Sequence, residues 1–309
     1  MSIAICFNNK DPEPWRQFLQ QKLTEVNIEI YPEITDKHRV TFALCWKADK
    51  NILTQFPNLK VVQSVGASID HLTLNQDLPK DITLSRIVDK RLSSDMYEFL
   101  LAGILSHIKG FSAYSQDKDQ KKWVQRNYKT IPETNVAILG LGKIGALVGS
   151  QLANLGFMVK GWSQSEKDIP KVSAFFGELG LKETMKDADI LINILPLTPA
   201  TKNILNRQTL SLLKSGAYLI NVGRGEHLVE NDLLVLLDTG HLSGALLDVF
   251  RTEPLPLSHP FWKQENIRIT PHVAALTQVD SAADIVVTNY RRMLAGQELM
   301  HLASLEKGY

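Results

Sequence analysis

Short apolar runs alternate with amphipathic segments along the chain. In the first hundred residues, five apolar runs are typical of strands: Ile3–Phe7, Val26–Tyr31, Thr41–Trp46, Lys60–Ser64 and Ile82–Ser85. Helical patterns lie between most of these runs. Because strands that alternate with helices form parallel sheets, this order predicts repeated βα units around a mainly parallel sheet.

A second series of apolar runs predicts six further strands: Asn135–Gly140, Met158–Trp162, Ile190–Leu195, Ala217–Val222, Gly244–Phe250 and Asn266–Thr270. Six strands in βα order predict a doubly wound fold that binds dinucleotides. Between the two series we expect one long helix, with Ser94 as its N-cap and its end near Ser115. A last helix is expected from about Thr277 to Leu294.

The length of 309 residues corresponds to about two domains. We expect a substrate domain of residues 1–100 and 281–309, interrupted by a dinucleotide-binding Rossmann domain of residues 101–280. The predicted fold class is therefore α/β, with two Rossmann-like or flavodoxin-like domains, mainly parallel sheets and a cleft between the domains that holds a ligand.

Composition and charge exclude several classes of protein. Hydrophobic residues at 44% and charged residues at 22% exclude a disordered chain, a collagen and a coiled coil. The net charge of +1, without a run of five or six Lys or Arg residues, argues against nucleic acid or an anionic membrane as a partner. No basic segment precedes the first apolar run, and no stretch approaches the 18 or so apolar residues that span a bilayer.

The two cysteines, Cys6 and Cys45, lie in apolar strand-like stretches and form no CxxC pair. We expect buried free thiols rather than a disulfide or a reactive pair. Together with the absence of a targeting signal in the sequence, this predicts a reducing, cytoplasmic location.

A glycine-rich turn with the spacing GxGxxG stands directly between a predicted strand and a predicted helix. Gly140 permits the tight turn, Gly142 lets a pyrophosphate approach the backbone, and Gly145 lets the helix pack on the strand. The helix N-terminus offers its N–H groups and its dipole to the anion. This context favours dinucleotide binding over a purely structural glycine turn.

The residue at the end of the second strand of the fold decides the cofactor. An Asp or Glu there binds the ribose 2′-hydroxyl of NAD, but this chain has Ser163 followed by Gln164. Without a carboxylate to repel a 2′-phosphate, and with Lys167 nearby, NADP is favoured. Glu166 and the lack of an arginine oppose this, so NAD stays as the alternative.

Three polar residues follow three consecutive predicted strands. Arg224 follows the strand that ends at residue 222, Glu253 the one that ends at residue 250, and His272 the one that ends at residue 270. Ligands of open α/β sheets bind beyond the carboxyl ends of the strands. Singly, these residues could be a surface turn arginine, a solvated acid and a helix-capping histidine, but their joint placement favours a hydride-transfer site.

Reduction of a 2-keto acid needs a cation for the carboxylate and the keto oxygen, and an acid that protonates that oxygen. The guanidinium of Arg224 can bind a carboxylate with two parallel bonds. His272 is the acid type whose ordinary pKa lies nearest neutrality, and Glu253 would favour its protonated form and fix its tautomer. The other histidines show no HxxxH-type spacing, so we expect no catalytic metal.

The motifs GLGKIG, NVGRG, DVFRTEPLP and TPHVAA resemble, in order and spacing, those of the D-isomer-specific 2-hydroxyacid dehydrogenase family, and the resemblance covers essentially the whole chain. The chain is most similar to the glyoxylate/hydroxypyruvate reductase A branch, through ALCWK, GRGEHLVENDLL, LASLEKGY and the missing acid at Ser163. The resemblance implies that Arg224 and His272 are catalytic, that Glu253 pairs with His272, and that Asp248 lies near the nicotinamide. It also implies a homodimer.

The resemblance further implies that backbone amides near Ala67 and Ser68, in VGASID, hold the substrate carboxylate. Many relatives have a glycine where Ser68 stands, and the NADPH-favouring arginine of the branch is replaced by Gln164. Trp46 either shapes the substrate pocket or is a core residue. The predicted cofactor-binding residues are Gly140, Gly142, Lys143, Ile144, Gly145, Ser163, Gln164, Lys167, Leu195, Pro196 and Asp248.

The sequence therefore predicts an enzyme that reduces a small 2-keto acid, such as glyoxylate or hydroxypyruvate, with NADPH or NADH. In this prediction His272 gives the proton and Arg224 binds the substrate. Two alternatives stay open: a cofactor-sensing interaction protein without turnover, and a nucleotide-fold methyltransferase that uses the glycine turn for another cofactor.

Overall fold

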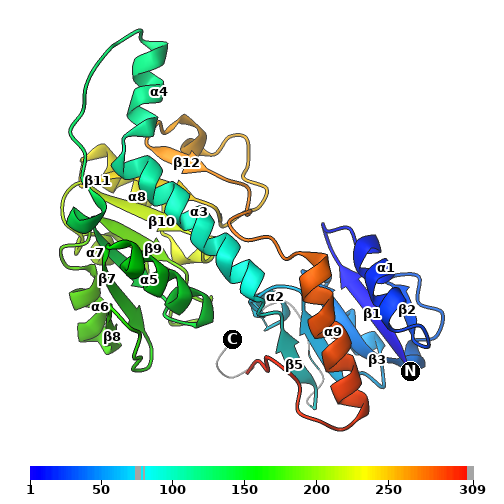
Figure 1. Cartoon of the computed structure of the whole chain (residues 1–309). Coiled ribbons are helices and arrows are strands. Elements are labelled where there is room, and N and C mark those ends of the chain that lie inside the picture. The colour runs from blue at the N-terminus through cyan, green and yellow to red at the C-terminus, as the bar shows by residue number, and fades with distance from the viewer. Residues whose placement is uncertain (74–77, 79–80, 305–309) are drawn as a thin grey trace. The chain divides into compact units, whose positions relative to one another are not determined.

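The computed structural model describes residues 1–73, 78 and 81–304 (Figure 1). The chain divides into two compact units: unit 1 comprises Met1–Leu92 and Thr277–Tyr309, and unit 2 comprises Ser93–Leu276. Each unit contains one sheet, and all strand pairs within the two sheets are parallel in the described part of the chain. The predicted α/β class with two mainly parallel sheets is confirmed.

The sheet of unit 1 has the strand order β2-β1-β3-β4-β5, which is the flavodoxin-like order. Its strands are β1 (Ser2–Phe7), β2 (Asn27–Ile30), β3 (Val40–Trp46), β4 (Val61–Ser64) and β5 (Thr83–Arg86). Each strand lies within one residue of its predicted bounds. The apolar runs predict these strands well because most of their residues are buried, which demands continuous apolar sequence.

Two helices distant in sequence, α1 (Glu13–Lys22) and α9 (Val279–Leu294), lie side by side on one face of this sheet (Figure 1). Trp15 of α1 and Tyr290 of α9 are buried there against strand residues such as Phe42. The opposite face is covered by the short helix α2 (Asp70–Thr73) and a 3-10 turn (Leu53–Gln55). The predicted last helix is thus present, and it packs in unit 1.

A buried asparagine in α9 fixes this packing. Asn289 is completely buried, and its Nδ2 donates to Gln63 Oε1 at 3.1 Å and to Ser85 Oγ at 3.0 Å. Its Oδ1 accepts from the backbone N–H of Met300 at 2.7 Å. Because these partners lie on β4, on β5 and in the segment after α9, one side chain ties the returning chain to the sheet.

Cys6 and Cys45 are confirmed as buried free thiols. They are register partners on the neighbouring strands β1 and β3. A hydrogen bond with Cys6, together with burial, raises the pKa of the Cys45 thiol well above its ordinary value. Cys45 therefore stays protonated and acts as a small apolar core residue.

The sheet of unit 2 has the order β12-β11-β10-β9-β6-β7-β8. Its strands are β6 (Asn135–Leu139), β7 (Met158–Ser163), β8 (Val172–Phe176), β9 (Ile190–Asn193), β10 (Ala217–Asn221), β11 (Leu242–Leu247) and β12 (Ile267–Ile269). The order reverses at β6 and β9, as in the doubly wound dinucleotide fold, so the ligand crevice of that fold corresponds to the carboxyl ends of these two strands.

The prediction of six strands was wrong by one, because it omitted β8. This strand lies at the edge of the sheet, and none of its residues is fully buried, although its sequence VSAFF is mostly apolar. The predicted strand Gly244–Phe250 also differs from the structure. The strand β11 ends at Leu247, which leaves Asp248 in the loop beyond the carboxyl end.

Helices cover both faces of this sheet. On one face lie α3 (Lys90–Ile108) and α5 (Lys143–Leu155), and on the other lie α6 (Gly177–Met185), α7 (Arg207–Leu210) and α8 (Glu230–Asp238). In the part of the chain that the structure describes, no helix is both long and apolar enough to cross a membrane.

The single long helix expected from Ser94 to Ser115 is wrong in its start and in its continuity. The helix α3 begins at Lys90, so Ser94 lies inside the helix rather than at its N-cap. Gly110 has a φ of +70° and separates α3 from α4 (Phe111–Asp119). The left-handed backbone at this glycine ends the first helix.

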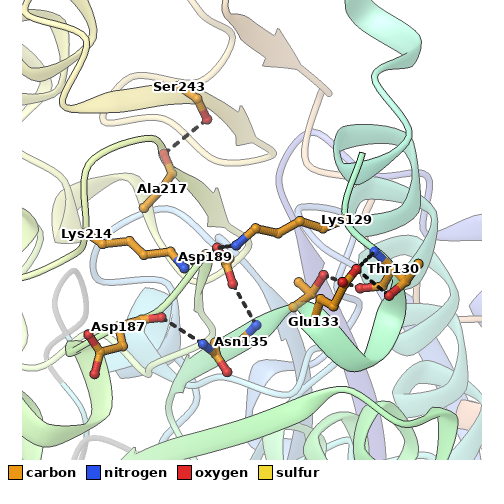
Figure 2. Close-up of polar contacts among 10 residues, drawn as sticks. Lys129, Thr130, Glu133, Asn135, Asp187, Asp189, Lys214, Ala217 and Ser243 are labelled. Atoms are coloured by element: carbon orange, nitrogen blue, oxygen red, sulfur yellow. Dashed lines mark hydrogen bonds and ion pairs between the residues drawn. The ribbon is translucent and has the colours of Figure 1, made fainter. Parts of the chain in front are cut away.

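Asp189 joins the amino-terminal ends of β6 and β9 (Figure 2). Its carboxylate accepts from the backbone N–H of Asn135 at 2.9 Å and from Lys129 Nζ and Lys214 Nζ, both at 2.5 Å. Burial alone would raise the pKa of Asp189, but these hydrogen bonds outweigh it and hold the pKa below its ordinary value. The cluster stabilises the sheet edge opposite the one where ligands bind.

Candidate active site

The glycine turn of unit 2 follows β6 and opens α5. Gly140 has a φ of +112°, and a Cβ at this position would lie 2.9 Å from the carbonyl oxygen of Ile194. A Cβ at Gly145 would lie 1.8 Å from the carbonyl oxygen of Gly140. At Gly142, in contrast, no heavy atom lies within 4 Å of the Cβ position. The backbone thus approaches Gly140 and Gly145 too closely for a side chain, while the space beside Gly142 is open.

This open space fits a dinucleotide pyrophosphate. Gly142 is the N-cap of α5 and has no side chain that could bond the first N–H groups of this 13-residue helix. Those N–H groups and the helix dipole attract an anion that approaches the bare backbone. Leu195 N lies 3.1 Å from the Cβ position of Gly140, so the segment of Leu195 and Pro196 adjoins the turn. The structure brings these predicted cofactor-binding residues together at the reversal of strand order.

Alanine at the two buried glycines of α5 should have opposite effects. We expect Gly145→Ala to destabilise the protein by about 3 kcal/mol or more, because its Cβ would overlap a backbone oxygen. Gly149→Ala is the matched control: its Cβ would lie 3.4 Å from Ile138 and Val172, which is ordinary contact, and alanine favours the helix. Urea unfolding measures both, and equal stabilities would contradict the close approach at Gly145.

The end of β7 carries a hydroxyl where a carboxylate binds the ribose of NAD. Ser163 is buried, and its Oγ donates to the carbonyl oxygen of Ser165 at 2.6 Å. Gln164, Glu166 and Lys167 follow on the exposed loop. The structure thus places the predicted cofactor-discriminating residues next to β6 and its glycine turn.

His272 and Glu253 form a hydrogen-bonded pair beyond β11 and β12. His272 Nδ1 lies 2.9 Å from Glu253 Oε2, and Glu253 Oε1 accepts from the backbone N–H of Phe250 at 3.2 Å. Both side chains are partly exposed, His272 at 30% and Glu253 at 23%. Because Nδ1 faces the carboxylate, Nε2 is the nitrogen that can present a proton to a ligand.

Asp248 holds the backbone on both sides of His272. Its buried carboxylate accepts from Thr270 Oγ1 at 2.6 Å and from the backbone N–H groups of Val273 and Ala274, both at 2.9 Å. The Asp248 carbonyl also accepts from the backbone N–H of His272 at 2.8 Å. His272 has a φ of +57°, a backbone conformation that residues other than glycine rarely adopt. The hydrogen bonds to Asp248 maintain it.

Arg224 lies in the turn after β10 and is partly buried. Its Nη1 donates to the carbonyl oxygen of Gly223 at 2.8 Å. A Cβ at Gly225 would lie 1.9 Å from the backbone of Phe250, so this turn packs on the segment that leads to Glu253. The neighbouring strands β10, β11 and β12 thus carry Arg224, Glu253 and His272 to one edge of their sheet.

The residues predicted to contact the substrate, Trp46, Ala67 and Ser68, lie at the carboxyl edge of the sheet in unit 1. Trp46 is half-buried at the end of β3, with its ring 5.3 Å from that of His71 and its Cζ3 2.8 Å from the Cβ position of Gly66. Ala67 and Ser68 follow β4, and their backbone N–H groups donate no hydrogen bond among the described residues. The substrate role of these three residues stays a prediction.

Comparisons with known proteins decide the family. Residues 101–274 match the family model described as D-isomer specific 2-hydroxyacid dehydrogenase, NAD binding domain. A glyoxylate/hydroxypyruvate reductase A from Photorhabdus laumondii is 36% identical over 314 residues, with all of both chains covered. The chain belongs to the D-isomer specific 2-hydroxyacid dehydrogenase family. The predicted family and its reductase A branch are confirmed.

Solved structures of other family members match this dehydrogenase over its whole length. One from Xanthobacter autotrophicus Py2, solved with NADPH and MES, is 33% identical, has a TM-score of 0.95 and covers 100% of this chain and 99% of its own. An NADPH-dependent glyoxylate/hydroxypyruvate reductase from Sinorhizobium meliloti, solved with NADP and sulfate, is 32% identical, has a TM-score of 0.94 and matches with all of both chains. The predicted enzyme class, an NAD(P)-dependent 2-hydroxyacid dehydrogenase, is confirmed.

Proposed function

We propose that this dehydrogenase reduces small 2-keto acids, with glyoxylate and hydroxypyruvate as its leading substrates, and prefers NADPH to NADH. The observation that carries the proposal is the His272–Glu253 pair at the carboxyl edge of the sheet that also carries the glycine turn. The relatives named glyoxylate/hydroxypyruvate reductase A support the substrate class.

His272 acts as the general acid in this proposal. The bound nicotinamide cofactor supplies a hydride to C2 of the keto acid. His272 Nε2 gives its proton to the keto oxygen, so that one hydride and one proton convert the C=O group into an alcohol. Glu253 at Nδ1 orients the imidazole, so that Nε2 is the nitrogen that gives the proton.

Arg224 binds the substrate in this proposal. A planar guanidinium can bond a carboxylate or a developing alkoxide with two N–H groups, which a point charge such as lysine cannot. The partial burial of Arg224 strengthens these bonds because water screens them less. The predicted homodimer and cytoplasmic location stay predictions.

The experiment that tests this function is NADPH oxidation, followed by absorbance, with a panel of 2-keto acids that includes glyoxylate and hydroxypyruvate. We expect turnover with both. Binding of NADPH without turnover of any 2-keto acid would instead favour the cofactor-sensing interaction protein.

The cofactor preference is tested by Ser163→Asp. A carboxylate at the end of β7 would repel the 2′-phosphate of NADPH and bond the ribose hydroxyls of NADH. We expect the ratio of kcat/KM for NADPH to that for NADH to fall by about tenfold or more, with the KM of glyoxylate little changed. Lys167→Gln should weaken the binding of NADPH and leave the binding of NADH unchanged. A wild-type enzyme that works better with NADH would contradict the preference.

A further inference from the structure

A buried polar cluster lies directly behind Arg224, and the mechanism above uses none of its side chains. His227, Asn193 and Asn221 are all completely buried. Asn193 and Asn221 end the neighbouring strands β9 and β10, and His227 ends the 3-10 turn Gly225–His227 that follows Arg224. Buried polar groups cost free energy unless they are hydrogen-bonded, so the bonds of this cluster constrain its surroundings.

The two ring nitrogens of His227 face different partners. Nδ1 lies 3.0 Å from the backbone N of Arg224 and 2.9 Å from Asn193 Nδ2, while Nε2 lies 3.2 Å from the carbonyl oxygen of Pro196. A backbone N–H can only donate and a carbonyl can only accept. Nδ1 is therefore the acceptor and Nε2 carries the hydrogen, which defines one neutral tautomer.

The two asparagines complete the hold on the Arg224 turn. Asn193 Nδ2 donates to Asn221 Oδ1 at 2.8 Å, and Asn221 Nδ2 donates to the carbonyl oxygen of Arg224 at 3.2 Å. Both backbone polar groups of Arg224 are thus bonded to the cluster. A Cβ at Gly223 would lie 2.8 Å from Asn193 Nδ2 and 2.9 Å from His227 Nδ1, so the turn packs directly on these side chains.

We propose that His227 is a positioning residue that fixes two functional segments at once. Through Nδ1 it holds the Arg224 turn, and through Nε2 it holds Pro196, whose segment adjoins the glycine turn. A single rigid ring therefore sets the substrate cation relative to the cofactor-binding loop. This inference rests on the proposed function of Arg224.

Two substitutions of His227 test the bonds of its two ring nitrogens separately. The Oδ1 of an asparagine can replace Nδ1 as the acceptor for the Arg224 N–H but does not reach Pro196. The Nε2 of a glutamine can replace the ring Nε2 as the donor to Pro196 but leaves the Arg224 N–H without its acceptor. We expect His227→Asn to raise the Kd of NADPH about tenfold with little change in the KM of glyoxylate, and His227→Gln to do the reverse.

The Kd of NADPH is measured by fluorescence titration without keto acid, and the KM of glyoxylate at saturating NADPH. His241→Asn is the matched control. His241 Nε2 also faces a carbonyl oxygen, that of Leu210, but His241 lies just before the amino end of β11, at the edge of the sheet opposite Arg224. This substitution should change neither constant. Should either His227 variant fail to fold, Asn221→Ser removes the donor to the Arg224 carbonyl and the acceptor for Asn193 Nδ2 and the Gly223 N–H, but it keeps both ring contacts of His227. It should raise the KM of glyoxylate severalfold without changing the Kd of NADPH.

Wild-type constants in both His227 variants would overturn the proposal. Equal increases in the Kd of NADPH and the KM of glyoxylate in both variants, together with a lower Tm, would also overturn it, because they indicate a merely structural role. An unchanged KM in Asn221→Ser would do the same for the Arg224 half. If the wild-type protein turned over no 2-keto acid, the proposed function would fail by itself, while the Kd of NADPH would still report on the Pro196 half.

Discussion

His272→Gln is expected to lower kcat for 2-keto acid reduction by about 10² to 10⁴-fold. Glutamine can occupy part of the space of the imidazole, but its amide cannot give a proton to the keto oxygen. The Kd of NADPH should stay close to the wild-type value, because His272 acts on the keto acid in this mechanism. Steady-state rates at saturating NADPH and glyoxylate measure the loss.

The chain offers a matched control for this substitution. His259 also faces a carboxylate, with its Nε2 3.4 Å from Glu230 Oε2, but its ring packs on Phe261 and it is the N-cap of the 3-10 turn Pro260–Lys263. His259→Gln should therefore leave kcat unchanged. A kcat of His272→Gln within threefold of wild type would contradict the role of His272 as the acid.

The strand-end residues were predictable because parallel strands bring their carboxyl ends to one edge. Arg224, Glu253 and His272 are distant in sequence, yet each follows a strand by a few residues. The apolar run before each residue gives the position of the strand, and the fold gives the shared edge. The bond between His272 and Glu253, which the resemblance implies, is present in the structure.

The residues that hold this edge in place were not predictable in the same way. Asp248, Asn193, Asn221 and His227 are buried polar residues whose partners depend on which strands are neighbours. Asn193 meets Asn221 because β9 and β10 are paired, which the sequence alone does not state. The only signal is a polar residue at the end of an apolar run, and this signal does not separate a ligand-binding residue from a buried anchor.

The strands and helix ends also differ in how well the sequence predicts them. Apolar runs predicted the buried strands, whereas the short run VSAFF of the partly exposed edge strand β8 was missed, because a run this short that leads directly into the helix α6 can equally belong to a helix. The start of α3 at Lys90 was missed because Ser94 is a residue type that favours an N-cap, although no cap is needed there. The break at Gly110 depends on its left-handed backbone, and a glycine inside a helical pattern does not by itself require one.

Arg224→Ala is expected to lower kcat/KM for glyoxylate by about 10² to 10³-fold, mainly through a higher KM, with the Kd of NADPH little changed. The substitution removes the guanidinium that bonds the keto acid but keeps the backbone bonds of residue 224 to His227 and Asn221. Arg224→Lys should give an intermediate loss, because it restores the charge without the two parallel bonds of a guanidinium.

Arg251→Ala is the matched control: Arg251 Nε donates to the carbonyl oxygen of Leu228 at 2.8 Å, so its loss should reduce stability without raising the KM of glyoxylate. An Arg224→Ala enzyme with wild-type kcat/KM for every 2-keto acid would show that another group binds the substrate.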